Sequence, residues 1–451
     1  MAHALDRHVV LVGFMGAGKS TIGEEVARRL GRPFRDVDRE VEAAHGPIWD
    51  LFAREGEAAF RELEASFVRT ACAPGAPSVI AVGGGAVETR GLLEELDALV
   101  VHLEVDVDTA WARVQGSRRP LAQDETAFRA RFETRKPLYA GVADARAWDA
   151  DDVVLAAAGI RFAPYTEAEG DALVTDARVA RLHAIEATMA IEASKTLADA
   201  ERLWSGLVLD RSSTLVGVGG GTTTDLVGFV AATYMRGIAW VAVPSTLVGQ
   251  VDAAIGGKVA VDLPAGKNLV GAFHWPAQTV IDTTLLETLP DEERRNGLAE
   301  VVKTGLLAGE ALWELPTQEL VRKCAAFKVG ICLRDPYERG ERAHLNLGHT
   351  FGHALEVASG YTIAHGHAVA LGLLAALRLS GLDDEVETVE GILSPSRVHV
   401  DAEIAWQALQ RDKKAVDGQV RLVLLDAPGR PRVTSEIEPP RVRAALDDLI
   451  A

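Results

Sequence analysis

Short apolar runs alternate with amphipathic segments along the chain, a pattern typical of folds in which helices connect parallel strands. Residues 8–14, 79–82, 214–218 and 240–243 are apolar enough to be buried strands. Residues 21–30 and 197–207 have the periodicity of amphipathic helices. The pattern therefore predicts an α/β fold for most of the chain.

A change of pattern near residue 160 predicts a domain boundary. Residues 149–165 are predicted to form the last strand of the first domain and a short connection without a long linker. Residues 173–176 are predicted to form a new strand that is followed by a polar turn. A chain of 451 residues can hold two or three domains. We therefore place a domain boundary near residue 160.

A glycine-rich loop lies between the first strand and the first helix. Residues 13–20, GFMGAGKS, fit GxxxxGK[ST], in which backbone amides face phosphate oxygens, Lys19 reaches the outer phosphates and Ser20 can bind Mg²⁺. Asp36 and Asp38 follow a second short strand. If both aspartates lie on one face of this strand, one carboxylate could bind the Mg²⁺ water shell and the other could accept a hydrogen bond from an acceptor hydroxyl. The alternative is that they are acidic residues preceding a helix.

Glycines and basic residues then follow at intervals. Arg61 lies in a charged helical segment, and Gly83, Gly84 and Gly85 follow a strand, where backbone amides can approach a small polar ligand. A charged segment begins near Arg119 and ends near Arg135. Basic residues on a mobile segment can close over a transferring phosphoryl group. These features predict a phosphotransferase.

Four histidines lie within residues 342–367, RAHLNLGHTFGHALEVASGYTIAHGH. If residues 345–357 form one helix, Asn346, His349 and His353 share a face. Imidazole is the commonest metal ligand, and catalytic zinc holds three protein ligands with one position open. A buried histidine pair without metal is the structural alternative. His367 follows two residues after His365 and could compete as a ligand.

The carboxylate of this site is expected from an apolar helix. Glu300 and Lys303 lie one turn apart in GLAEVVKTG. A buried glutamate is costly unless it is paired or metal-bound, so Glu300 completes a predicted zinc site with His349 and His365. A surface Glu–Lys pair is the alternative.

Further glycines and lysines predict a nucleotide and an anion near this site. The triplet 219–221 between strand and helix fits a pyrophosphate-binding turn, although its spacing is not GxGxxG and a tight turn alone would explain it. Lys258, Lys267 and Asn268 lie in an otherwise apolar stretch, which favours an anion pocket.

Composition narrows the function classes. The net charge of −18 argues against a general nucleic-acid or membrane-surface role. Cys72, Cys324 and Cys332 form no CxxC pair, which suits a reducing compartment. The N-terminus is too short for a signal h-region before its glycine loop, and no apolar run reaches bilayer length. We expect a soluble cytoplasmic protein.

Residues 5–158 resemble shikimate kinase, because GFMGAGKST, DVD, FRELE, GGGAV, RRPL and RKPLY occur in that family's order. The resemblance implies ATP-dependent phosphorylation of shikimate, with a lid shorter than the family's. A small-metabolite kinase with another acceptor is the alternative. The implied residues are Gly16, Ala17, Gly18, Lys19, Ser20 and Thr21 for ATP; Ser20 and Asp36 for Mg²⁺; Asp38, Arg61, Gly83, Gly84, Gly85 and Arg135 for shikimate; and Asp38, Lys19 and Arg119 for catalysis.

Residues 170–435 resemble 3-dehydroquinate synthase in GGGTTTDLVGFVAATYMRG, VDAAIGGK, GKNLVGAFHWP, GLAEVVKTG, ERAHLNLGHTFGHALE, HGHAVALG and RDKK. The implied NAD⁺ residues are Asp176, Glu192, Lys195, Gly220, Gly221, Asp225, Ser245, Thr246, Lys258, Lys267 and Thr288. Those implied for a heptulosonate phosphate are Arg236, Asn268, Lys328, Arg342, Asn346 and Lys413, with Asp252, Lys258, Lys303 and His353 as catalytic residues. Glu300, His349 and His365 would hold Zn²⁺ or Co²⁺.

The second resemblance implies a redox cycle without net consumption of NAD⁺: a substrate alcohol is transiently oxidised, phosphate leaves, the hydride returns, and the ring opens and recloses. Residues 177–191 and the span from Lys303 to Lys328 are shorter than in the family, and Val259, Asp262 and His367 differ from its usual residues. Another sugar-phosphate cyclase, or a non-catalytic partner domain, is the alternative. Together the resemblances imply a P-loop α/β domain at 1–160, a Rossmann-like nucleotide domain at 161–290 and an α-helical metal-binding domain at 291–451. We expect a bifunctional shikimate-pathway enzyme that forms a homodimer through its synthase half.

Overall fold

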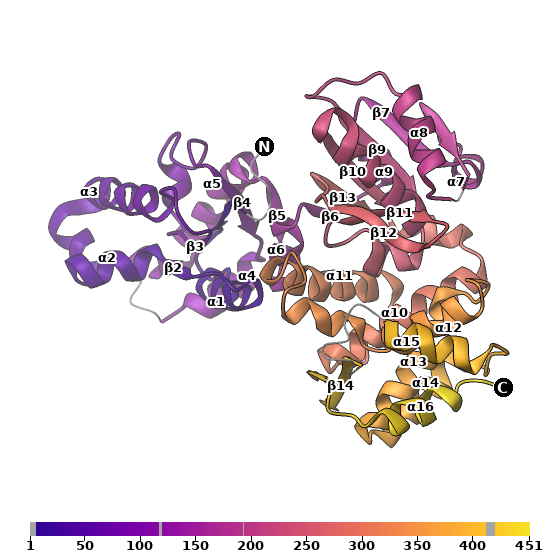
Figure 1. Ribbon diagram of the computed structural model, residues 1–451. Coiled ribbons are helices and arrows are strands. Elements are labelled where there is room, and N and C mark those ends of the chain that lie inside the picture. The colour runs from indigo at the N-terminus through magenta and orange to yellow at the C-terminus, as the bar shows by residue number, and fades with distance from the viewer. Residues whose placement is uncertain (1–5, 117–119, 193, 412–419) are drawn as a thin grey trace. The chain divides into compact units, whose positions relative to one another are not determined.

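The computed structural model describes residues 6–116, 120–192, 194–411 and 420–451 of the chain (Figure 1). The chain divides into two compact units, Met1–Ile160 and Arg161–Ala451. No helix among these described residues is long and apolar enough to cross a membrane.

The first unit is built on a parallel sheet with strand order β2-β3-β1-β4-β5. The strands are β1 (His8–Val12), β2 (Phe34–Asp36), β3 (Val79–Ala81), β4 (Ala98–Leu103) and β5 (Ala145–Ala147). The helices are α1 (Lys19–Leu30), α2 (Val37–His45), α3 (Ile48–Ala71), α4 (Val107–Val114), α5 (Glu125–Val142) and α6 (Ala150–Ala157), with short 3₁₀ turns η1 (Ala86–Glu88) and η2 (Pro120–Ala122). The β1 strand is buried along its whole length, as a central parallel strand requires.

The second unit begins with a sheet of order β6-β13-β10-β9-β7-β8. Its strands are β6 (Ile160–Phe162), β7 (Ala172–Asp176), β8 (Met189–Ile191), β9 (Thr214–Gly219), β10 (Ala239–Pro244) and β13 (Gln278–Ile281). Neighbouring strands in the row β13-β10-β9-β7-β8 pair in parallel. The helices α7 (Ala177–His183), α8 (Leu197–Gly206) and α9 (Gly221–Thr233) accompany the sheet, and β11 (Lys258–Leu263) and β12 (Gly266–Phe273) form an antiparallel pair beside it.

The rest of the second unit is mainly helical. It contains α10 (Asp291–Ala308), α11 (Thr317–Arg334), α12 (His349–Ala358), α13 (His365–Ser380), α14 (Asp383–Leu393), α15 (Ala402–Arg411) and α16 (Pro439–Asp447), with an antiparallel pair β14 (Leu422–Ala427) and β15 (Arg430–Thr434). The almost wholly apolar α13 contributes buried residues throughout its length, and α10 and α12 pack on it. The predicted α/β class, with a helical region at the end, is confirmed.

Three local predictions were wrong. Residues 149–165 hold helix α6 before any strand, because Asp149 accepts from the Asp152 amide and starts a helix; β6 then joins the second sheet. Residues 173–176 lead into helix α7 rather than a turn, since Asp176 accepts from the amides of Arg178 and Val179.

The third error concerns the histidine segment. Residues 345–357 are not one helix: the 3₁₀ turn η8 (Glu341–Asn346) ends before Leu347, and α12 begins at His349. Gly348 lies between them with φ of 77°, and a Cβ there would stand 2.9 Å from the Leu373 amide nitrogen. The close approach of α13 therefore forces a glycine break at this position.

Candidate active sites

The glycine loop of the first unit leaves the start of helix α1 open. Gly18, the residue before α1, has φ of 91° and no side-chain cap. Gly16 has φ of 87°, and a Cβ there would lie 2.6 Å from the Ala110 carbonyl oxygen. Lys19 Nζ donates to the Gly13 carbonyl at 2.8 Å, which folds its cation over the loop. A helix start without a side-chain cap, next to a folded-back lysine, suits phosphate.

A hydroxyl and a carboxylate meet beside this loop. Ser20 Oγ donates to Asp36 Oδ2 at 2.6 Å, and Asp36 Oδ1 accepts from the Arg39 amide at 3.2 Å. Ser20 and Asp36 are thus positioned as a Mg²⁺ site would need. The prediction that Asp36 and Asp38 share a strand face is wrong. Asp36 ends β2 and caps α2, so that Asp38 lies in the first turn of that helix.

A cavity of about 450 Å³ opens next to Ser20 and Asp36. Its walls include all the side chains and glycines predicted to bind the acceptor: Asp38, Arg61, Gly83, Gly84, Gly85 and Arg135. A Cβ at Gly85 would lie 2.1 Å from Arg61 Nη2, and one at Gly83 would lie 1.9 Å from Glu64 Oε1. The glycines therefore let an arginine and a glutamate reach the cavity floor.

The Arg61 side chain is held by two carboxylates. Its Nη1 donates to Glu64 at 2.6 Å and its Nη2 to Glu57 at 3.0 Å. Burial raises the pKa of Glu64, although Arg61 opposes the shift. Among the described residues, Arg61 Nε and Glu64 Oε1 are buried without a hydrogen-bond partner, so polar capacity remains for a ligand.

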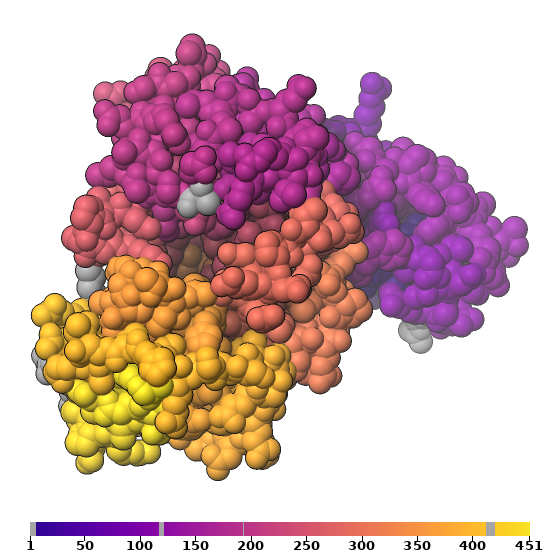
Figure 2. All heavy atoms as spheres, turned by 90° about the vertical axis from the view of Figure 1, so that its right-hand side faces the viewer, coloured from indigo at the N-terminus to yellow at the C-terminus, as the bar shows by residue number. Residues whose placement is uncertain are grey.

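The second unit contains a larger cavity, of about 890 Å³, at the carboxyl ends of its parallel strands. Figure 2 shows the hollow between the β6–β13 sheet and the helical region of this unit. Gly220 precedes α9 without a side-chain cap, and a Cβ at Gly221 would lie 2.9 Å from that of Ala253. The predicted residues that line it are Asp176, Lys195, Gly220, Gly221, Ser245, Thr246, Asp252, Lys267, Asn268, Thr288, His353 and His365.

An adjoining cavity of about 550 Å³ is rich in cations. Lys303 and Lys328 are buried, and they share Asp252: its Oδ1 lies 3.6 Å from Lys303 Nζ and 2.8 Å from Lys328 Nζ. Burial alone would raise the pKa of Asp252, but the two lysines lower it to about 2. One carboxylate therefore serves two buried ammonium groups.

Lys258, Arg342 and Asn346, all predicted for the phosphate-bearing substrate, also line this cavity. Arg342 is buried and donates to the Gly256 carbonyl at 2.8 Å. Glu338, which sequence analysis missed, is in contact with Lys258 and accepts from Asn346 Nδ2 at 3.0 Å. Asp225, predicted for the dinucleotide, also lines this cavity and accepts from Lys195 at 2.7 Å.

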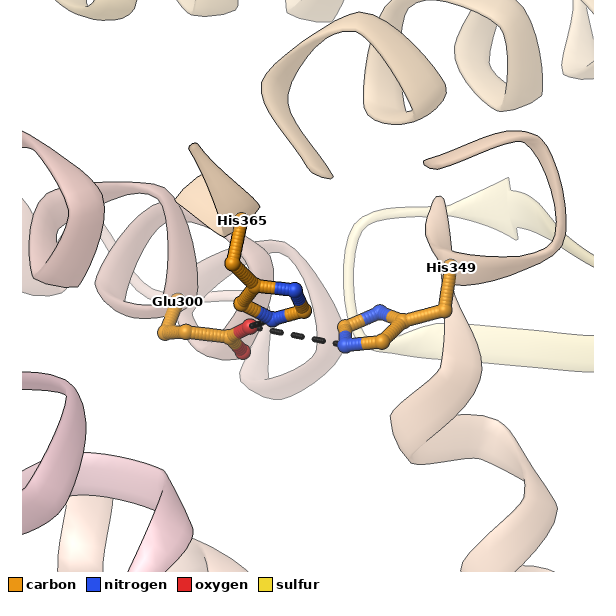
Figure 3. A group of neighbouring side chains, drawn as sticks. All are labelled: Glu300, His349 and His365. Carbon is orange, nitrogen blue, oxygen red and sulfur yellow. Dashed lines mark hydrogen bonds and ion pairs between the residues drawn. The ribbon is translucent and has the colours of Figure 1, made fainter. Parts of the chain in front are cut away.

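Glu300, His349 and His365 come together from three helices, α10, α12 and α13 (Figure 3). Glu300 Oε1 lies 3.4 Å from His349 Nε2 and 3.1 Å from His365 Nε2. One ligand atom of each residue lies within 4.8 Å of the other two. Two atoms bound at about 2.0–2.1 Å to one zinc ion at a tetrahedral angle are roughly 3.3–3.4 Å apart. The donor set and its spacing therefore fit such an ion.

The outer nitrogens of both imidazoles are also engaged. His349 Nδ1 lies 3.2 Å from the Leu347 carbonyl oxygen, and His365 Nδ1 lies 3.4 Å from Glu356 Oε1. Such contacts fix the tautomer and turn each Nε2 toward the common centre. Glu356, another residue missed from the sequence, is buried and lines the larger cavity.

The charges around this cluster shift its pKa values. Burial alone would raise the pKa of Glu300, but Lys303 and His349 hold it well below its usual range. Burial and Lys303 lower the pKa of His349. For His365, burial would lower the pKa, yet Glu300 and Glu356 raise it to about 10.

Some predicted residues lie elsewhere. Glu192 is exposed, and Arg236 is an exposed residue with φ of 68°; neither lines either of the two cavities described above. His367 does not join the metal cluster, because its Nε2 lies 2.8 Å from the Ser396 carbonyl oxygen. Arg119 and Lys413 lie outside the described residues.

The missed residues are acidic or amide side chains to which the quoted motifs assign no role, although Glu64 ends FRELE and Glu356 ends ERAHLNLGHTFGHALE. Glu64 and Glu356 lie three residues after a predicted ligand, Arg61 and His353, so helical spacing could have found them. Glu338, Glu88 and Asn296 approach their sites only through the fold.

The fold and these sites together define a P-loop phosphotransferase joined to an enzyme with nucleotide, anion and metal-ligand sites. Three family models match the chain: shikimate kinase over residues 15–158, the N-terminal part of 3-dehydroquinate synthase over 186–296 and its C-terminal part over 297–415.

Curated relatives and solved structures agree with the second assignment. The 3-dehydroquinate synthase of Symbiobacterium thermophilum is 40% identical over 321 residues, which cover 61% of this chain and 90% of that protein. The enzyme of the same name from Bradyrhizobium diazoefficiens is 35% identical over 353 residues, 66% of this chain and 92% of that protein. The 2-epi-5-epi-valiolone synthase ValA of Streptomyces hygroscopicus, solved with NAD⁺ and Zn²⁺ bound, has the same fold, with a TM-score of 0.57 at 24% identity over 64% of this chain and 95% of ValA.

The chain belongs to the 3-dehydroquinate synthase family and has a shikimate kinase domain that precedes its synthase half in the sequence. It is a bifunctional enzyme of the shikimate pathway with kinase and lyase domains, as its sequence predicts.

Proposed function

We propose that the first unit transfers the γ-phosphoryl group of ATP to a hydroxyl of shikimate. The observation that carries this proposal is the position of Ser20 and Asp36. They lie beside the open start of α1 and also line the acceptor cavity, so donor and acceptor would meet there. Ser20 and Asp36 would hold Mg²⁺, which would offset the negative charge of the phosphates.

The residues of the first unit have distinct roles in this proposal. Residues 16–21 cradle the phosphates, and Lys19 neutralises the outer ones. Asp38 orients the attacking hydroxyl and accepts its proton, while Arg61 and Arg135 hold the acceptor's carboxylate. Arg119 would contribute a further positive charge to the transferring group.

Shikimate-dependent ADP formation tests the kinase proposal. Asp38→Asn should lower kcat by about 10²-fold or more, because the hydroxyl loses its base. Full activity on shikimate in that variant, or a strong preference for an acceptor without a carboxylate, would contradict it.

We propose that the second unit converts 3-deoxy-D-arabino-heptulosonate 7-phosphate to 3-dehydroquinate and phosphate, with NAD⁺ and Zn²⁺ or Co²⁺. The carrying observation is that His365 and Asp252 line both cavities of this unit, so the metal-ligand cluster adjoins both the dinucleotide space and the anion space. Solved relatives of the same fold contain NAD⁺ with Co²⁺ or Zn²⁺.

Glu300, His349 and His365 would hold the metal, whose chemistry when bound is to polarise a substrate hydroxyl or carbonyl oxygen. NAD⁺ supplies a reversible hydride acceptor. Lys258, Lys303, Lys328, Arg342, Asn268 and Asn346 supply positive charge and hydrogen-bond donors to the phosphate-bearing substrate. His353 faces both cavities and can exchange protons with a substrate held between them.

The synthase proposal is tested by supplying the heptulosonate phosphate, NAD⁺ and Zn²⁺ and identifying the product. Dehydroquinate dehydratase should convert it to an ultraviolet-absorbing compound. Phosphate release that yields a different cyclic product would favour another sugar-phosphate cyclase. A purified protein that binds neither NAD⁺ nor zinc would favour a non-catalytic partner domain.

We also propose that the chain forms a homodimer through its synthase half and works in the cytoplasm. The support for a dimer is the turn at Met235 and Arg236, two exposed consecutive residues with positive φ that lie outside both cavities. Strained surface residues of this kind persist where another contact holds them. Sedimentation velocity should give twice the chain mass. The three cysteines are free, which suits a reducing compartment.

A further inference from the structure

Arg135 is held by a carboxylate from a distant part of the chain. It lies on α5 with only 1% of the residue exposed, and Glu88 lies at the end of η1. Arg135 Nε donates to Glu88 Oε1 at 2.9 Å, and Nη2 donates to Oε2 at 2.6 Å. Nη1 donates to the Gly84 carbonyl at 3.2 Å. This two-bond pairing fixes both the position and the plane of the guanidinium.

Glu88 holds Arg135 from outside the acceptor cavity. Arg135 and Gly84 line that cavity and Glu88 does not; 37% of its side chain is exposed. A guanidinium has five N–H groups. The three bonds above leave one N–H on each terminal nitrogen without a partner among the described residues. Two N–H groups are what a bidentate carboxylate needs.

The charge state of Glu88 agrees with this arrangement. Burial alone would raise its pKa, but the hydrogen bonds and charge of Arg135 lower it below its usual value. Glu88 is therefore ionised at neutral pH, and the pair stays formed when the cavity is empty. Arg61 differs, because its partner Glu64 itself lines the cavity.

We propose that Glu88 is a positioning residue of the kinase unit: it locks Arg135 so that the remaining N–H groups face the carboxylate of the acceptor, and it thereby sets the preference for carboxylated acceptors. This proposal rests on shikimate being the acceptor. Glu88 touches neither substrate nor nucleotide, so its effect passes through Arg135.

The test uses the full chain with Glu88→Gln, Glu88→Ala and Glu88→Asp, assayed with shikimate and with its carboxamide. Glu88→Gln keeps the shape but loses the charge, so Arg135 can turn away. The KM for shikimate should rise about tenfold, the equivalent of one lost charged hydrogen bond, while kcat and the KM for ATP change by no more than about twofold. Glu88→Ala should raise this KM further, and Glu88→Asp should restore part of the loss.

The carboxamide separates positioning from general damage. Because it lacks the charge that Arg135 recognises, its KM should be nearly the same in wild type and Glu88→Gln. The preference for shikimate over the carboxamide should therefore fall about tenfold. The matched control is Glu95→Gln, which breaks an exposed pair between Glu95 and Arg69 Nε at 2.7 Å and should leave both KM values unchanged.

Each outcome decides the proposal. An unchanged preference in a folded Glu88→Gln protein would overturn it, and a lower KM for shikimate would show that Glu88 competes with the substrate. If a variant has little activity, its shikimate affinity is measured by titration calorimetry. Wild-type affinity there would also overturn the proposal. Failure of the wild-type chain to phosphorylate shikimate would instead refute the proposed kinase function.

Discussion

The acceptor cavity of the kinase unit and the anion cavity of the synthase unit balance buried positive charge in different ways. In the first, Arg135 has its own carboxylate in Glu88, and Arg61 has Glu57 and Glu64. In the second, Lys303 and Lys328 share Asp252, and Lys303 also contacts Glu300 of the metal-ligand cluster. The separate pairs should respond to substitution locally, whereas the shared network should respond as a whole.

The arginine pairs suit a cavity that recognises one planar anion. Guanidinium groups present paired donors in fixed directions, so orientation matters more than total charge. The lysine network suits a substrate whose charge distribution changes during turnover. Ammonium groups act as compact charges that several oxygen atoms can approach.

The largest expected effect is that of Asp252→Asn. It leaves Lys303 and Lys328 buried without their shared counter-charge, so the second unit should lose about 3 kcal/mol of unfolding free energy. Synthase turnover should fall by at least about 10²-fold, because the two cations that hold the substrate's anionic group are displaced. Chemical denaturation and phosphate release measure the two effects, with kinase activity as the internal control. A loss of turnover with unchanged stability would show that Asp252 acts on substrate alone and that the network is not shared.

A second prediction concerns the contact between Glu356 and His365 Nδ1. Glu356→Gln keeps an acceptor but loses the charge that orients this imidazole, so zinc affinity should fall about 10–100-fold. Competition with a chromophoric chelator measures the dissociation constant directly. Glu390→Gln, which removes an exposed partner of Arg378 in the same unit, is the control. Equal zinc affinities in all three proteins would mean that Glu356 does not support the metal site.

Arg61→Lys tests the importance of paired donors in the kinase cavity. Lysine keeps the charge but has one nitrogen, so it cannot replace the two guanidinium nitrogens that bind Glu64 and Glu57. The KM for shikimate should therefore rise about tenfold. Initial rates at varied shikimate and fixed ATP give this value. A lysine variant with wild-type KM would show that charge alone suffices there and would remove the contrast with the synthase cavity.

The smallest expected effect is a pH dependence of stability from His102, a buried histidine on β4. Burial, with smaller contributions from Arg146 and Lys19, lowers its pKa to about 4. The unfolded chain, with a pKa of about 6.5, binds this proton more readily. The free energy of unfolding is therefore not reduced by His102 above about pH 6.5, and it decreases as the pH falls toward 4 because only the unfolded chain takes up the proton.

The loss should be of the order of 1 kcal/mol, since nearby solvent screens part of the charge. Thermal unfolding of the kinase unit between pH 7 and 4.5 measures it, and His102→Asn should flatten the curve. A variant with the same slope as wild type would assign the pH dependence to other groups.

What the sequence could predict depended on whether the partners of a residue are near it in the chain. The glycine loop works through its own backbone, so residues 13–20 could be interpreted without tertiary information. Glu300, His349 and His365 were recognisable because their residue types and spacing are restrictive. By contrast, the break at Gly348 depends on α13, which packs too closely for a side chain there.

Acidic partners that lie far from their cations in the sequence could not be predicted. Glu88 and Glu338 carry no motif, and each meets its cation only after strands and helices distant in sequence have packed. The sequence predicts that Asp36 and Asp38 share a strand face because they lie two residues apart after a short strand. Asp36 instead caps helix α2, which begins at Val37, so Asp38 lies in the first turn of that helix.

We infer that one chain contains two active sites that work independently. The most direct test measures both turnover numbers in wild type, Asp38→Asn and Glu300→Ala, with shikimate and ATP for one reaction and the heptulosonate phosphate, NAD⁺ and Zn²⁺ for the other. We predict that wild type catalyses both, that Asp38→Asn loses only phosphorylation and that Glu300→Ala loses only phosphate release. A wild-type chain that phosphorylates shikimate but releases no phosphate from the heptulosonate would contradict the claim.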